Sequence, residues 1–199
     1  MNRLVIYIHG KDGNAIEAEH YKPLFNNSTV IGFDYKSQTP QEAKKEFSEF
    51  FDLYSNGYDS VIVVANSIGA FFAMNSLSGK HIEKALFISP IVDMEKLINS
   101  MMIQANVTED ELRQKKEIHA GFGETLSWEY LCYVREHPLT WNIPTSILYG
   151  ESDDLTSFET MSAFAHKIGA SLTVMKDGEH WFHTDEQMHF LDDWIKSSV

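Results

Sequence analysis

The stretch around Ser67 has the composition expected of a nucleophile on a sharp turn. Residues 61–64 form a continuous β-branched run, which is typical of a central parallel strand covered on both faces. The segment after Ser67 is apolar on nearly every side and ends at Gly79, which predicts a buried helix. Ser67 stands between the small residues Ala65 and Gly69, which let a strand and a helix approach around an exposed hydroxyl. The alternative is that the hydroxyl only caps the helix.

A serine hydroxyl is a poor nucleophile until a base takes its proton, and the base needs a group that holds its tautomer. Two downstream loops offer such groups. Asp153 follows the apolar run 146–149, and His180 follows the run 171–175. Ser67, Asp153 and His180 therefore all lie just beyond predicted strands, where open α/β sheets bind ligands.

The acid has two competitors in the sequence. Asp154 is chemically equivalent to Asp153, which could itself cap the following helix. Asp93 follows the fourth predicted strand, and it also has the position of a helix N-cap with Lys96 at the third helical position. We expect Asp153 to be the acid, because three residues after Gly150 the chain can turn back over the sheet.

The base has competitors as well. His183 and His189 are expected at or on the final helix, which leaves His180 as the preferred base. With Asp185, these three histidines form a cluster that could hold a metal ion. Its spacing matches no defensible ligand pattern, so we expect no metal site.

Six strand-like runs alternate with helical patterns along the chain. Strands are expected at 4–8, 30–35, 61–64, 85–89, 146–149 and 171–175. Helix starts with capping residues are expected near Asn14, Thr39, Thr156 and Thr184. This alternation predicts an α/β fold with a doubly wound, mostly parallel six-stranded sheet flanked by helices.

More than 50 residues separate the strands expected at 85–89 and 146–149. The intervening segment has a methionine-rich helical pattern, a charged helix capped by Thr108, and an aromatic stretch at 128–134. This composition predicts helices over the sheet's edge and not another sheet layer. We therefore expect a single domain, residues 1–199, with a helical cap inserted at about 91–142.

The segment 65–69, Ala-Asn-Ser-Ile-Gly, resembles the nucleophile elbow of the α/β-hydrolase superfamily, which reads small-x-Ser-x-Gly. The chain order Ser67, Asp153, His180 matches the superfamily's order of nucleophile, acid and base, and Asp153 lies three residues after Gly150 as the superfamily's acid does. The resemblance covers almost the full chain, without the superfamily's first two strands. It implies an α/β-hydrolase fold, these three catalytic residues and no cofactor. Ala65 replaces the more usual glycine, which weakens any subfamily assignment.

The same resemblance implies an oxyanion hole made by the backbone N–H groups of Ile68 and Lys11. Gly10 would let the backbone come close to the substrate. His9, in the same loop, is expected to make a structural hydrogen bond and to have no catalytic role.

The resemblance implies a serine hydrolase that cleaves a small acyl substrate, most simply a carboxylic ester, through an acyl-enzyme on Ser67. Amide, peptide, thioester or carbon–carbon bond cleavage would use the same residues, and a non-catalytic binding protein of the same fold is the alternative from another class. In the insertion, Met101 and Trp128 could line an adaptable apolar pocket, or could only anchor the cap.

Composition and charge also bear on the partners and the location expected of this protein. A net charge of −13 and a pI of about 5.0 disfavour nucleic acid and anionic lipid surfaces as partners. The partner that the resemblance implies is a small-molecule acyl substrate. Cys132 is the single cysteine and cannot form an internal disulfide, and a core strand begins at once after Met1, so we expect a cytoplasmic protein. No apolar run approaches the roughly 20 residues that cross a bilayer.

Overall fold

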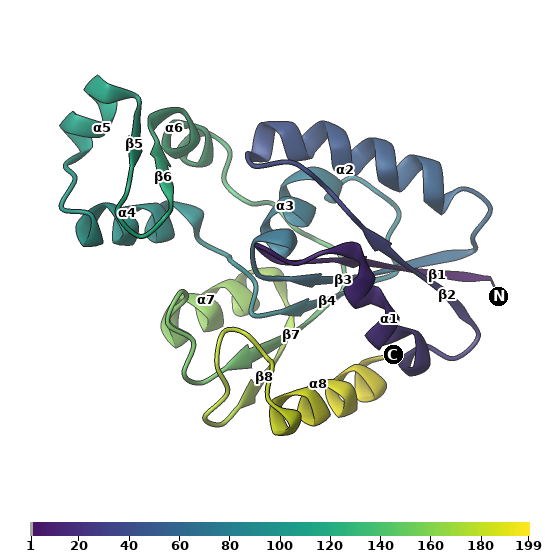
Figure 1. Cartoon of the computed structure of the whole chain (residues 1–199). Helices are drawn as coiled ribbons and strands as arrows, with labels where there is room; N and C mark the ends of the chain where they lie inside the picture. The colour runs from purple at the N-terminus through teal and green to yellow at the C-terminus, as the bar shows by residue number, and fades with distance from the viewer. Residues whose placement is uncertain (1) are drawn as a thin grey trace. The chain divides into compact units, whose positions relative to one another are not determined.

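The computed structural model describes residues 2–199, and its main feature is a six-stranded sheet (Figure 1). The strand order is β2-β1-β3-β4-β7-β8, and each neighbouring pair is parallel. The strands are β1 (Arg3–Ile8), β2 (Ser28–Phe33), β3 (Ser60–Asn66), β4 (Lys84–Ile88), β7 (Thr145–Gly150) and β8 (Ser171–Met175). The six expected strands are all present, and the doubly wound parallel sheet is confirmed.

Helices cover both faces of this sheet. They are η1 (Ala15–Glu17), α1 (Ala18–Tyr21), η2 (Lys22–Leu24), α2 (Pro40–Ser55), α3 (Ser67–Leu77), α7 (Phe158–Ile168) and α8 (Asp185–Ser198). Figure 1 shows α2 and α3 on one side of the sheet and α1 and α8 on the other. The central strand β3 is buried from Ser60 to Ala65, as expected of a strand covered on both faces.

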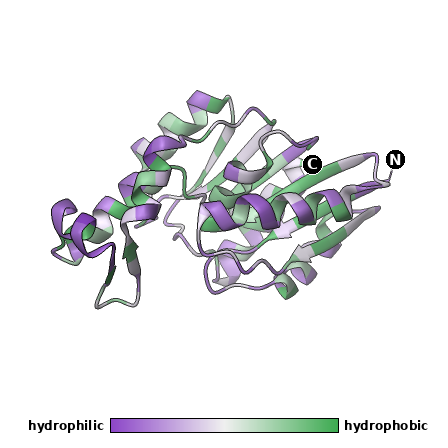
Figure 2. Ribbon diagram, turned by 90° about the horizontal axis from the view of Figure 1, so that it is seen from above, coloured by the Kyte–Doolittle hydropathy of each residue, from purple (hydrophilic) through white to green (hydrophobic). Residues whose placement is uncertain are grey.

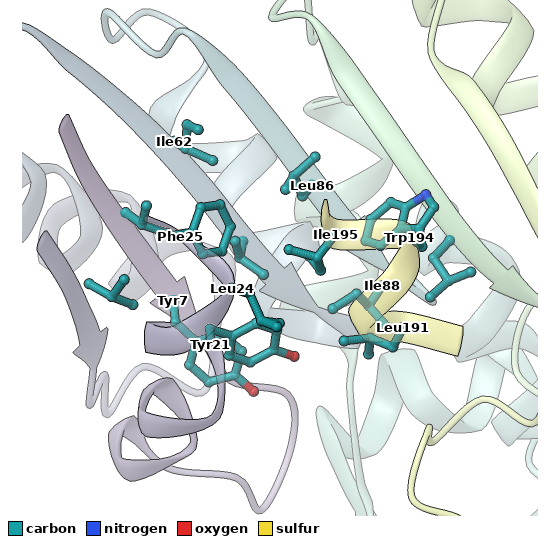
Figure 3. Close-up of a cluster of buried hydrophobic side chains, with 14 of the residues drawn as sticks. Tyr7, Tyr21, Leu24, Phe25, Ile62, Leu86, Ile88, Leu191, Trp194 and Ile195 are labelled. Carbon is teal, nitrogen blue, oxygen red and sulfur yellow. The ribbon is translucent and has the colours of Figure 1, made fainter. Parts of the chain in front are cut away.

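One core cluster lies between the sheet and the pair α1 and α8. Alternate strand residues such as Val5 and Tyr7 of β1 face it, because side chains along a strand alternate between the two faces. Figure 3 shows Leu191, Trp194 and Ile195 of α8 pointing into the same cluster. In Figure 2 the strands of the sheet are mostly hydrophobic, whereas the helices carry both polar and apolar residues.

The capping residues explain where several helices begin. Thr39 and Glu42 form a capping box at α2, and Thr184 and Gln187 form one at α8, as the sequence predicts. The predicted start of α7 near Thr156 is wrong by one residue. Ser157 is the N-cap, and its side chain accepts from the Thr160 backbone N–H.

The chain divides into two compact units, and the triad candidates lie in the first, which comprises residues 1–92 and 140–199. The second unit, residues 93–139, is described by itself. It contains α4 (Met94–Gln104), α5 (Glu109–Lys115), β5 (Glu117–His119), β6 (Thr125–Ser127) and α6 (Trp128–Glu136).

The second unit is mainly helical, but it also holds an antiparallel pair, β5 with β6, which was not predicted. Each strand has three residues, too few for an alternating pattern to be detected in the sequence. Arg135 of α6 joins the helices, with N–O distances of 2.6 Å to Glu95 of α4 and 2.8 Å to Glu109 of α5. The Arg135 guanidinium lowers the pKa of Glu109, since it donates hydrogen bonds to the charged carboxylate.

Across residues 2–199, no helix has the length and apolar character needed to span a membrane.

Candidate active site

Ser67 lies at the junction of β3 and α3, in a backbone conformation that is uncommon for a residue with a side chain. Its φ is +48°, in the left-handed region. The turn requires a small residue at position 69, because a Cβ on Gly69 would lie 2.2 Å from the His9 carbonyl oxygen. The backbone of α3 therefore packs directly against the end of β1, which leaves Ser67 at the turn.

Ser67, His180 and Asp153 form a continuous chain of hydrogen bonds. The His180 Nε2 lies 2.8 Å from Ser67 Oγ, and His180 Nδ1 lies 2.7 Å from Asp153 Oδ2. The Asp153 side chain is fully buried and that of His180 is 15% exposed. The predicted nucleophile, base and acid are thus brought together from loops that follow β3, β8 and β7.

The loops that carry the acid and the base are held together by their backbones. Ser152 N donates to the Gly178 carbonyl at 2.8 Å. A Cβ on Gly150 would lie 2.5 Å from the carbonyl oxygens of Gly178 and Glu179, so only glycine allows this close approach. Gly150 therefore lets the loop that carries Asp153 pack directly against the loop that carries His180.

Both oxygens of the Asp153 carboxylate make hydrogen bonds. While Oδ2 faces His180, Oδ1 accepts from the backbone N–H groups of Leu155 at 2.9 Å and Thr156 at 3.0 Å. Of the two interpretations of Asp153 from the sequence, orientation of the base agrees with the Oδ2 contact. The Oδ1 contacts are to the turn before α7, whose N-cap is Ser157, so Asp153 does not cap that helix. Burial raises the pKa of Tyr149, with a further contribution from the charge of Asp153.

The competing acids are engaged or directed elsewhere. Asp93 caps α4, since its Oδ1 accepts from Lys96 N at 2.9 Å. Asp154 is exposed, next to the buried carboxylate of Asp153. Of the three candidates, Asp153 makes the contact with His180.

The competing histidines also have local partners. His183 Nδ1 lies 2.7 Å from the Trp181 carbonyl oxygen, and His189 Nδ1 lies 2.6 Å from that of Asp185, on α8. Within residues 2–199, no group of three or more His, Cys, Asp or Glu side chains is placed to hold a metal ion.

The loop after β1 lies against the nucleophile. A Cβ on Gly10 would lie 3.3 Å from Ser67 Cβ, so the loop that carries Lys11 passes directly beside Ser67. Ile68 is the second residue of α3, and the first four N–H groups of a helix have no partner within it. These positions are compatible with the predicted N–H donors. His9 Nδ1 lies 2.7 Å from the Gly10 carbonyl oxygen and the ring stacks on Tyr35, which agrees with a structural role.

The remaining predicted contacts, Met101 and Trp128, belong to the second unit. Trp128 lies on a cavity of about 520 Å³ in that unit, together with Cys132 and Lys116. Met101 is half-buried on α4. Their roles as substrate contacts stay predictions.

Sequence reasoning missed a polar cluster behind Ser67. Asn66 Nδ2 donates to the Tyr7 hydroxyl at 2.9 Å, and that hydroxyl donates to the Glu17 carboxylate. A signal was present in the sequence, because Tyr7 is the one residue with a polar tip in the otherwise aliphatic run 4–8.

No model of a known protein family matches the chain. A curated protein of Mycoplasma genitalium, named "Putative esterase/lipase 3", is 25% identical over 107 residues, which is 52% of this chain. The matched segment spans only 38% of that relative's length.

Solved structures match over nearly the whole chain. Est1E from Butyrivibrio proteoclasticus has a TM-score of 0.81 at 15% identity, covering 99% of this chain and 86% of its own; a second structure of it contains ferulic acid. Mouse alpha/beta hydrolase domain-containing protein 10 has a TM-score of 0.77 at 18% identity, with coverages of 98% and 88%. The esterase domain of a Rhodothermus marinus protein has a TM-score of 0.67 at 12% identity, with coverages of 99% and 85%. The chain has the α/β-hydrolase fold.

Proposed function

We propose that this protein is a serine hydrolase that cleaves small carboxylic esters through an acyl-enzyme on Ser67. The observation that carries the proposal is the hydrogen-bond chain from Ser67 through His180 to the buried Asp153. In this arrangement the imidazole can accept the serine proton at Nε2 while the carboxylate holds a proton on Nδ1.

The reaction has two halves. Ser67 Oγ attacks the acyl carbon as its proton passes to His180 Nε2, and the negative charge on the former carbonyl oxygen is stabilised by the Ile68 and Lys11 N–H groups. Collapse of the tetrahedral intermediate breaks the acyl–oxygen bond, and His180 gives its proton to the departing alcohol. Water then gives a proton to His180 as it attacks the acyl-enzyme. Collapse of the second tetrahedral intermediate releases the carboxylic acid, and His180 returns the proton to Ser67 Oγ.

Two further observations support the substrate class. The names of the similar proteins include esterases and an esterase/lipase, which favours an ester over an amide or a thioester. The net charge of −13 repels polyanionic substrates, so we propose an uncharged ester.

The test combines labelling with turnover. The parent should react with a fluorophosphonate probe and hydrolyse p-nitrophenyl esters, with a preference among acyl chain lengths that reports the acyl pocket. Ser67→Ala should remove labelling and reduce kcat by roughly 10⁴ or more, because the nucleophile is lost while a small side chain is kept.

Ser89→Ala is the matched control. Ser89 is also a buried serine just beyond a strand, β4, with a left-handed φ of +43°, and its hydroxyl has no hydrogen-bond partner among the described residues. This variant should keep parental labelling and turnover. A parent that neither reacts with the probe nor hydrolyses the esters would be a non-catalytic protein of the same fold. Full labelling of Ser67→Ala would mean that another residue is the nucleophile.

A further inference from the structure

Asn66 stands at the N-cap of α3 without capping it. Asparagine is among the preferred N-cap residues, and Asn66 has the extended backbone of an N-cap, with φ −104° and ψ 140°. The N-cap side chains of α2, α4, α5, α6, α7 and α8 each accept a hydrogen bond from their own helix. The side chain of Asn66 makes no such bond.

The Asn66 amide contacts Tyr7 instead of its own helix, and Tyr7 contacts Glu17. The Tyr7 hydroxyl gives its proton to the Glu17 carboxylate, so toward Asn66 it can only accept, and it takes a hydrogen bond from Asn66 Nδ2 at 2.9 Å. The other Glu17 oxygen accepts from Asn14 N at 3.0 Å, which fixes the carboxylate. The Tyr21 ring stacks on Tyr7, and its hydroxyl interacts with the same amide.

The held orientation leaves an acceptor unused. Asn66 Oδ1 is buried and has no hydrogen-bond partner among residues 2–199. An N-cap side chain accepts from the N–H of the second or third helical residue, and in α3 these are Ile68 and Gly69. If Asn66 capped its helix, it would therefore compete for the N–H group that an oxyanion on Ser67 needs.

We propose that Tyr7 and Glu17 are positioning residues that hold Asn66 off α3 and thereby keep the Ile68 N–H available to the oxyanion. The inference rests on the proposed function. It predicts that release of Asn66 lowers activity without lowering stability, because the released side chain gains a capping bond while the reaction loses a donor. If Tyr7 and Tyr21 had only a structural role, their substitution would lower both activity and stability.

The experiment removes the Tyr7 and Tyr21 hydroxyls and then removes the Asn66 side chain, which these substitutions are expected to release. In Tyr7→Phe/Tyr21→Phe, kcat for a p-nitrophenyl ester should fall by at least about tenfold, approaching the 10²–10³ known for loss of one oxyanion donor. KM should change less than about threefold and Tm should stay equal or rise, because an extra donor matters mainly in the transition state. Hydrogen exchange of the Ile68 and Gly69 amides should slow.

Asn66→Ala supplies the control, since alanine cannot cap. Alone, it should keep kcat within about threefold of the parent, and it should restore kcat to that level when added to the two tyrosine substitutions. The inference would be overturned if Tyr7→Phe/Tyr21→Phe lost the same kcat with and without the added Asn66→Ala. It would also be overturned if Tyr7→Phe/Tyr21→Phe kept the parental kcat.

If the double tyrosine variant does not fold, Tyr7→Phe alone is compared with and without Asn66→Ala by the same criteria. A parent that neither labels with the fluorophosphonate nor turns over ester would refute the proposed function itself, and this inference with it. An active parent with an unresponsive Tyr7 refutes the inference alone.

Discussion

Two histidines of this protein contact a carboxylate at the same distance, in two different regions. His180 Nδ1 lies 2.7 Å from Asp153 Oδ2, and His20 Nε2 lies 2.7 Å from Asp192 Oδ1, between α1 and α8. The second nitrogen of His180 contacts Ser67, whereas the His20 ring packs against the Tyr21 ring in a T-shaped arrangement. The histidine–carboxylate distance therefore does not identify a catalytic site.

Burial of the acid is the second difference. The Asp153 side chain is 0% exposed and that of Asp192 is 23% exposed, while the two histidines are 15% and 37% exposed. A buried carboxylate is less screened by water, so it holds the imidazole in one orientation and stabilises its charged form more strongly. Two features therefore distinguish the His180–Asp153 pair from the His20–Asp192 pair. A serine contacts the other ring nitrogen of His180, and the Asp153 carboxylate is buried.

The largest expected effect comes from exchanging the acids for amides. In Asp153→Asn the amide oxygen can still accept from the Leu155 and Thr156 N–H groups, so the NH₂ group faces His180 Nδ1. The imidazole proton then moves to Nε2, which can no longer accept from Ser67. We expect kcat to fall by on the order of 10⁴ with little loss of fold, measured with one activated ester at one pH.

Asp192→Asn is the matched control and should stay within about twofold of the parental kcat, because no described contact joins that pair to Ser67. Asp154→Asn and Asp93→Asn should also stay near the parent. If Asp93→Asn collapses while Asp153→Asn stays within about tenfold, the assignment of the acid is wrong.

The second comparison exchanges the histidines themselves. His180→Ala should abolish the activity, because Ser67 loses the base that accepts its proton. His20→Gln should leave kcat near that of the parent, measured with the same activated ester. Retention of parental activity by His180→Ala would transfer the role of the base to another group.

The smallest expected effect is on stability. The His20 and Asp192 side chains are partly exposed, so Asp192→Asn should cost about 1 kcal/mol or less of unfolding free energy in urea. Asp193→Asn, one residue along α8, is the control, since Asp193 is 82% exposed beside Lys196. A cost for Asp192→Asn no larger than that for Asp193→Asn would mean that the contact with His20 does not contribute to stability.

The candidate triad could be predicted from the sequence because each residue follows a strongly patterned strand. Parallel strands end at one edge of the sheet, so the chain positions of Ser67, Asp153 and His180 already imply that they meet there. Gly69 and Gly150 could be recognised in the sequence as small residues. The need for glycine at each position comes from a backbone contact between segments distant in the chain, which no local pattern contains.

Local rules failed where a distant side chain overrode them. An asparagine before a helix predicts a cap, yet Asn66 is drawn to Tyr7, 59 positions away in the chain. The strands β5 and β6 lie in a polar stretch and depend on each other for their hydrogen bonds. Such features depend on tertiary structure, so a window of neighbouring residues cannot reveal them.

Because both oxygens of the Asp153 carboxylate make hydrogen bonds, Asp153 is a poor position at which to inactivate the protein for substrate capture. Its Oδ1 closes the turn that leads into α7, so removing the side chain would release backbone N–H groups of Leu155 and Thr156 as well as the base. Ser67 has no such second duty among its side-chain contacts. An inactive bait for capturing the physiological ester from a cell extract is therefore best built with Ser67→Ala, which leaves the acid and its loop intact to bind what they bind in the active protein.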